Sequence, residues 1–198
     1  MKILFKALVC GVLLTAVFSL AGFAGACEDI RQQVFRLHII ANSDSAEDQA
    51  MKLTVRNRLL EYTGNLFKKC RSKQESIECA KEHIDDIRRI ASDTVREYGC
   101  DYPVDAYVTK TDFNTRVYDD VTLPAGEYDA LRVVIGSGQG HNWWCVLFPA
   151  LCLPGSDSSE LRTVINDSEM NVVSSGEKYE VHFLFVEWME GLFSVFNW

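Results

Sequence analysis

Metal-binding spacings are missing from this sequence. It contains no CxxC, no HExxH, and no pair of cysteines followed by a pair of histidines. Zinc sites use these spacings because the ligands must converge on one ion. We therefore expect no metal and no cofactor.

Positive charge is also scarce. The chain carries 20 Lys and Arg against 28 Asp and Glu, which gives a formal net charge of -8 at pH 7. Nucleic acids and anionic lipids present negative phosphates and attract basic surfaces. We therefore expect no nucleic-acid partner and no attraction to an anionic membrane.

The first 26 residues have the features of an export signal. Lys2 and Lys6 give a positive start, an apolar run follows, and Ala24–Ala26 has the small residues of a signal-peptidase site. The alternative is an uncleaved anchor, because a membrane span needs about 18 apolar residues. In both cases we expect residues 27–198 to form a single exported domain.

The cysteines leave two possibilities open. All but one of the seven lie beyond the predicted signal. Export permits disulfides, and Cys145 with Cys152 or Cys70 with Cys79 are conceivable pairs. Free, buried cysteines are the simpler alternative, because cysteine is among the most often buried residues.

Apolar periodicity predicts a strand and two helices in the first half of the chain. Val34–Ile40 alternates, as a half-buried strand does. A helix is expected over 44–67, where Met51, Val55 and Leu59 begin an apolar stripe. A second helix is expected from the capping box at Ser72 to about residue 98, forming a helical hairpin with the first. The cations expected to face outward are Lys52, Arg56 and Arg58.

Period-two patterns follow this hairpin. They predict strands over 104–109, 117–123 and 128–135, joined by polar turns as in an antiparallel meander. The expected fold is therefore α+β, with an antiparallel sheet covered on one face by the helical hairpin.

The last part of the chain is more polar. Residues 154–178 predict a long, partly mobile surface excursion. A returning strand is expected over 179–185, and a short amphipathic helix from Glu187 onward. This C-terminal tail could dock on the core, or meet a membrane or a partner.

Leu131–Cys152 is the most distinctive stretch. Three glycines interrupt it, and Trp143, Trp144 and an apolar run follow. Glycines in such a loop permit tight turns or a close approach of other groups. The stretch could be a buried core element, a partner-binding surface or a cysteine-based active site.

Three segments carry a family resemblance. Residues 36–56 contain RLHIIANSDS followed by DQ and KLxVR, residues 123–132 are LPAGEYDALR, and residues 135–149 follow IGxGxGxNWWCVLFP. Together they resemble the stage II sporulation protein R family of endospore-forming bacteria. Ala150 departs from the family pattern, which has a second proline there, and the stretch after Pro154 is not covered.

This resemblance implies a signalling protein rather than an enzyme. Family members are made in the forespore and exported into the space between the two septal membranes. There they trigger a membrane-embedded aspartic protease of the mother cell, the stage II GA protein, which removes the pro-sequence of sigma factor E. The implied partner is that protease, with membrane proximity through it or through the C-terminal tail. No catalytic residue and no small-molecule substrate are expected.

The contact surface is a hypothesis that rests on glycines beside paired tryptophans, since aromatic anchors often dominate binding. Its proposed members are Gly136, Gly138, Gly140, Asn142, Trp143 and Trp144. The motif residues expected to be structural are Arg36, Asn42, Asp44, Arg56, Pro124, Gly126, Cys145, Pro149 and Cys152. Among them, Arg36, Asp44 and Arg56 are expected to form a network at the strand–helix junction.

Two other functions are compatible with parts of the sequence. His141 and Cys145 would share a face of a helix, and with Asp129 or Asn142 they could form a cysteine hydrolase. The surrounding aromatic residues would bury the thiol and raise its pKa, which favours a packed cysteine. A cell-wall or peptide-binding module would instead use the Gly136–Cys145 region as its platform.

Overall fold

The fold is described from a computed structural model that covers residues 2–118, 121–151, 161 and 164–174. The chain divides into two compact units. One consists of residues 33–112 and 127–164, and the other of residues 1–32, 113–126 and 165–198. The expected strand and helix over 179–198 lie outside the described residues.

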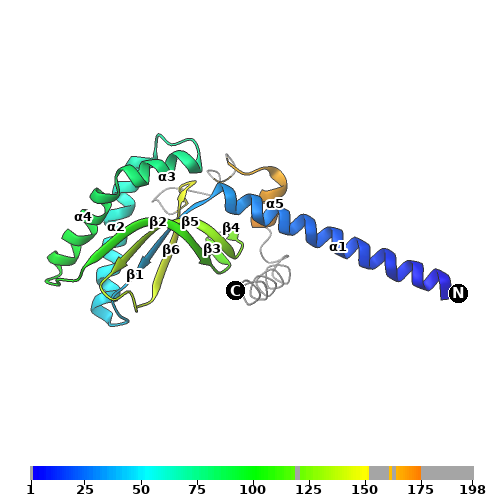
Figure 1. Cartoon of the computed structure of the whole chain (residues 1–198), viewed down its shortest axis with the longest axis horizontal. Helices are drawn as coiled ribbons and strands as arrows, with labels where there is room; N and C mark the ends of the chain where they lie inside the picture. The colour runs from blue at the N-terminus through cyan, green and yellow to red at the C-terminus, as the bar shows by residue number, and fades with distance from the viewer. Residues whose placement is uncertain (1, 119–120, 152–160, 162–163, 175–198) are drawn as a thin grey trace. The chain divides into compact units, whose positions relative to one another are not determined.

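A four-stranded sheet organises the first unit, with strand order β2-β5-β1-β6 (Figure 1). Its strands are β1 (Phe35–Ile40), β2 (Val104–Phe113), β5 (Gly126–Ile135) and β6 (Asn142–Phe148). β1 is central, and all six of its residues are buried. It pairs with β6 in antiparallel fashion and with β5 in parallel, Leu37 lying opposite Leu131.

Helices cover one face of this sheet. They are α2 (Ala46–Phe67), α3 (Lys73–Glu82) and α4 (Ile84–Glu97). Their stripes meet the inward residues of the strands in one core, where Val55, Ile87 and Leu131 are fully buried. The α+β fold with a helix-covered sheet is therefore confirmed, although the β1–β5 pair is parallel. The three-strand meander was wrong, because residues 116–118 and 121–123 pair with each other in a separate two-stranded sheet, and β2 lies next to β5.

The helix predicted from Ser72 to about residue 98 is divided in two. Ser72 caps α3 as expected, its Oγ accepting from the amide of Glu75 at 3.2 Å. His83 then leaves the helical conformation with φ -103° and ψ 18°, and α4 begins at Ile84. One continuous helix over this range was wrong, because periodicity continues across a one-residue break.

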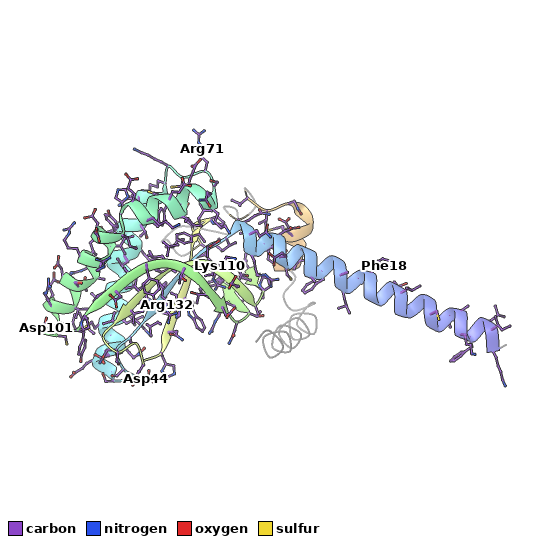
Figure 2. All side chains as sticks on the ribbon, in the orientation of Figure 1. Phe18, Asp44, Arg71, Asp101, Lys110 and Arg132 are labelled. Carbon is purple, nitrogen blue, oxygen red and sulfur yellow. The ribbon has the colours of Figure 1, made fainter. Side chains whose placement is uncertain are left out.

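The second unit contains α1 (Lys2–Gln33), the β3–β4 hairpin (Arg116–Tyr118 and Val121–Leu123) and α5 (Asp167–Ser174). Phe18, on α1, is 74% exposed (Figure 2). Among the residues that the structure describes, no helix has both the length and the apolar character needed to cross a membrane.

α5 falls within the stretch that was expected to be a surface excursion. Glu169 accepts from the amide of Asn166 at 2.9 Å, and Asn166 accepts from the amide of Glu169 at 3.0 Å, so the helix start is capped. Met170 and Val173 are buried. That expectation was therefore wrong for residues 167–174, because a short amphipathic helix in a polar stretch gives little periodic signal.

Candidate functional site

The most distinctive motifs meet at one end of the first unit. Residues 41–45 follow β1, and residues 136–141 follow β5. Because these strands are parallel neighbours, both segments leave the sheet at the same end. We call them the loop pair.

Asn42 joins the two segments. Its side-chain oxygen accepts from the amide of Ser137 at 2.9 Å, and its carbonyl oxygen accepts from the Ser137 hydroxyl at 2.7 Å. The amide of Gln139 donates to the same carbonyl at 3.2 Å, and the amide of Gly140 donates to the Ala41 carbonyl at 2.9 Å. The loop pair is thus held by several bonds between residues about 95 positions apart.

The three loop glycines are required by contacts inside the protein. A Cβ at Gly140 would collide with the carbonyl oxygen of Ser43, and one at Gly136 would collide with the Asn42 side chain. Gly136 and Gly138 also have φ of 60° and 62°, a left-handed conformation that other residues adopt at a cost. Their assignment as partner contacts stays a prediction, since internal packing already explains them.

Asp48 anchors the first segment to α2. It is 4% exposed and accepts from the Asn42 side-chain amide at 2.9 Å and from the Ser43 hydroxyl at 2.5 Å. Its own amide donates to the N-cap Ser45 at 3.1 Å. The Ser43 hydrogen bond, partly opposed by burial, lowers the pKa of Asp48, so the carboxylate remains ionised at neutral pH.

Lys52 was expected to face outward, and this was wrong. It is 4% exposed, and its Nζ donates to the His141 carbonyl oxygen at 2.7 Å and to Gln49 Oε1 at 2.6 Å. Burial lowers its pKa. Its position within the family motif was the only sequence signal for this role, because its partner lies 89 residues away.

Asp44 and His141 form an exposed pair across the loop pair. Asp44 Oδ1 accepts from the His141 amide and from its Nδ1, both at 2.5 Å. The hydrogen bond from the His141 side chain lowers the pKa of Asp44. Nδ1 donates this hydrogen bond, which leaves Nε2 as the ring nitrogen available for other contacts. Among the described residues, no hydroxyl or thiol contacts Nε2. The pair therefore lacks a nucleophile there.

The two tryptophans lie on opposite faces of β6. Trp143 pairs with Ile39 and Trp144 with His38, and successive strand residues point to opposite sides. The Arg56 guanidinium lies 5.0 Å from the Trp143 ring centre, whereas the Trp144 ring lies 5.7 Å from the His38 ring. Both tryptophans are half-buried, so each offers only part of its surface to a partner.

Arg36, Asp44 and Arg56 have different contact partners, and their assignment to one network stays a prediction. Arg36 is fully buried, and its guanidinium lies 4.8 Å from the Tyr128 ring centre. Asp44 contacts His141, and Arg56 contacts Trp143. Burial lowers the pKa of His38, and the nearby Arg132 and Arg36 charges act in the same direction, whereas a hydrogen bond with the Asn142 side chain acts against them.

Cys145 does not have the setting of a catalytic thiol. It is fully buried in β6, and it is disulfide-bonded. The premise that it shares a helical face with His141 was wrong, because β6 is a strand that starts after His141. Phe148–Pro149 is a cis peptide, and Cys152 lies outside the described residues. Within the described parts of the chain, no group of three or more potential metal ligands occurs.

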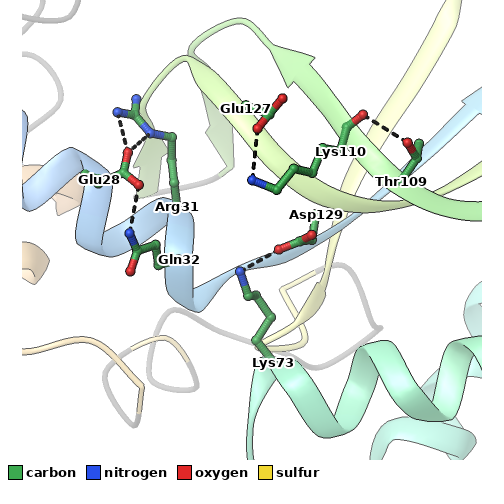
Figure 3. Close-up of polar contacts among 8 residues, drawn as sticks. All are labelled: Glu28, Arg31, Gln32, Lys73, Thr109, Lys110, Glu127 and Asp129. Carbon is green, nitrogen blue, oxygen red and sulfur yellow. Dashed lines mark hydrogen bonds and ion pairs between the residues drawn. The ribbon is translucent and has the colours of Figure 1, made fainter.

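The segment around Pro124 and Gly126 contacts α1 within the second unit. Arg31 donates to the Ala125 carbonyl oxygen at 2.6 Å, and a Cβ at Gly126 would lie 2.5 Å from the Arg31 guanidinium. Gly126 has φ of 133°, and Pro124 is buried. Glu28 pairs with Arg31 at 3.0 Å (Figure 3). The Arg31 guanidinium thus explains why glycine is needed at position 126. The sequence analysis assigned no role to Arg31.

The fold and the loop pair define an α+β domain whose most distinctive residues hold two chain segments together. The family model for stage II sporulation protein R matches residues 31–158, so this chain belongs to that family. It is also similar to the stage II sporulation protein R of Bacillus subtilis (strain 168), with 32% identity over 187 residues, covering 83% of this chain and 84% of the relative. No solved structure matches it.

Proposed function

We propose that this protein is an exported signal of endospore formation. It passes from the forespore into the space between the septal membranes and activates the membrane-embedded aspartic protease of the mother cell, the stage II GA protein. That protease then processes the pro-form of sigma factor E. Family membership is the single observation that carries the proposal.

Activation, rather than catalysis by this chain, fits the site. Cys145 is buried and disulfide-bonded, and the Asp44–His141 pair has no nucleophile beside it among the described residues. A protein that signals by binding needs instead a surface held in a fixed shape, since ordering a loop on binding costs free energy. The bonds around Asn42 provide such a surface at the loop pair.

The proposed contact surface is the outer side of this loop pair. Ser137, Gln139, His141 and Asn142 are exposed there, beside the accessible parts of the tryptophans. Loops fixed on a rigid scaffold are a common place for recognition. The partner would therefore contact the exposed polar side chains of the loop pair and the accessible edge of one tryptophan.

Export and activation can be tested together in a non-sporulating bacterium. The strain would produce the protease, the pro-sigma substrate and this chain, and substrate cleavage would be followed by immunoblot. We expect cleavage with the full chain, none after deletion of residues 2–26, and recovery when an unrelated signal peptide replaces them. Cleavage by the deleted form would contradict export, and no cleavage with the full chain would contradict activation.

The contact surface needs its own variants in this assay. Gln139→Ala and Trp144→Ala should each reduce cleavage while the protein accumulates normally. Gln74→Ala, at an exposed position of α3, is the matched control and should leave cleavage unchanged. Full activity of Gln139→Ala and Trp144→Ala would place the contact elsewhere on the protein.

A further inference from the structure

The turn between α2 and α3 is strongly basic in an acidic protein. Lys68, Lys69, Arg71 and Lys73 fall within six consecutive residues that contain no acid, whereas the whole chain has a net charge of -8. The first three are exposed, and Figure 2 shows Arg71 at the outer edge of this turn. Lys73 instead pairs with Asp129 at 2.7 Å (Figure 3). We call Lys68, Lys69 and Arg71 the basic rim.

A cavity opens beside the basic rim. It has a volume of about 330 Å³ and lies between the last turns of α2 and the end of β6. Leu60, Gly64 and Phe67 line it from α2, and Leu147 and Pro149 line it from the other side. Lys68 belongs to both the rim and the cavity wall. One cation of the rim therefore lines a mainly apolar hollow, and the other two follow it within three positions of the chain.

This cavity is separate from the loop pair. α2 has 22 residues and so spans about 33 Å, at 1.5 Å per residue. The loop pair contacts its first turns through Asp48 and Lys52, whereas the cavity lies along its last turns. The two features can therefore be altered independently.

We propose that the cavity and the basic rim bind an acidic peptide segment that inserts one large apolar side chain. The carboxylates of the peptide would lie against Lys68, Lys69 and Arg71, and its apolar side chain would fill the hollow beside Gly64. An anchor in an apolar pocket, surrounded by polar contacts, is the usual arrangement of energetically important interface residues.

A peptide explains the two observations together better than a membrane surface does. Anionic lipid headgroups would be attracted to the rim, but their attraction needs no apolar hollow beside the charges. The function proposed above supplies a natural source, an external segment of the receptor. Peptide binding itself can be measured without that receptor, so the two proposals can fail separately.

The direct test uses the full chain in non-ionic detergent and labelled peptides of sequence Asp-Glu-X-Glu-Asp. X would be Leu, Ile, Phe, Trp or Ala, and binding would be followed by fluorescence anisotropy. We expect at least one peptide with a large X to bind about tenfold more tightly than the Ala peptide, since burying such a side chain is favourable. Binding should weaken as salt is raised.

Two variants separate the rim from the hollow. Lys69→Glu with Arg71→Glu should weaken binding at least about tenfold, whereas Arg88→Glu with Arg96→Glu, the same charge change on exposed α4 positions, should leave it within about twofold. Gly64→Leu should block the hollow without disrupting α2, because leucine favours helix more than glycine does. Ala50→Leu, at an exposed position near the start of α2, is its control.

Several results would overturn the proposal. One is that no peptide binds at millimolar concentration. Another is that the Ala peptide binds as tightly as the peptides with a large X. A third is that the α4 control variant loses as much affinity as the rim variant. Binding to phosphatidylglycerol vesicles in place of the peptides would assign the rim to a membrane and would also overturn it. Circular dichroism of each variant ensures that a loss of binding is not a loss of fold.

Discussion

The two ends of α2 are built in opposite ways. At its start, Asp48 and Lys52 are almost fully buried and their charges are satisfied by hydrogen bonds to the loop pair. At its end, a glycine and several apolar residues surround a cavity, and exposed cations stand beside it. The closed end fixes the backbone, whereas the open end leaves surface available for another molecule.

This contrast shows why distinctive residues need not be contact residues. Asn42, Gly136 and Gly140 belong to the family motifs, and each is explained by a bond or a close approach within the protein. The basic turn belongs to the same matched region, yet its exposed cations form few internal bonds. Substitutions of the buried residues at the closed end should therefore act mainly on stability, and substitutions of the basic rim mainly on peptide binding.

The largest effect is expected at Gly140. In Gly140→Val the new side chain would collide with the Ser43 carbonyl, which is backbone and cannot turn aside. We expect a loss of about 3 kcal/mol in the free energy of unfolding, or failure to fold, measured in urea. Gly25→Ala, in α1 with nothing within 4 Å, is the control. Equal stability of both variants would mean that the loops are not packed this closely.

Lys52→Met should have the next largest effect. It keeps the length of the side chain but removes the donor to His141 and Gln49, leaving a carbonyl without that bond. The expected cost is about 2 kcal/mol in urea unfolding, as for other buried hydrogen bonds to charged groups. The same change at exposed Lys69 should cost less than about 0.5 kcal/mol. Similar losses at both positions would contradict the contrast between the two ends.

Asp48→Asn should remove a pH-dependent contribution at the closed end. The folded-state pKa of Asp48 lies below its ordinary value of 3.8, so the ionised group stabilises the fold above about pH 4. This contribution is lost as the pH falls through the folded pKa. We expect a loss of about 1 kcal/mol at pH 7 and a smaller dependence of the melting temperature on pH below 4. An unchanged acid dependence would show that Asp48 is not the group responsible.

The smallest effect is expected for Arg56→Gln. The guanidinium lies over the Trp143 ring at a partly exposed site, where a cation–π contact contributes about 0.5 to 1 kcal/mol. Urea unfolding followed by tryptophan fluorescence would measure the loss. Arg88→Gln, on exposed α4, should change stability by less than half of that amount. A loss larger than that of Lys52→Met would show that the Arg56 contact is a main support of this end.

Local physical chemistry was enough to predict much of the fold from sequence. The strand over Val34–Ile40 and the stripe of Met51, Val55 and Leu59 are confirmed as elements. The expectation that this strand is half-buried was wrong, because β1 lies between two other strands and its alternate residues, Arg36 and His38, are buried as well. Ser72 was identified as a cap because a capping bond joins residues three positions apart. These signals lie within a few residues of each other, so a sequence records them directly.

The tertiary structure decided the rest. A period of two is the same for parallel and antiparallel strands, so the parallel β1–β5 pair left no local trace. Lys52 was read as an outward cation because the carbonyl that binds it, that of His141, is remote in sequence. The loop glycines were noticed, but the groups that approach them, such as Ser43, could be identified only after folding brought the two segments together. The sequence alone determined the elements and the family motifs, whereas long-range packing determined which motif residues are held inside the protein and which are left exposed.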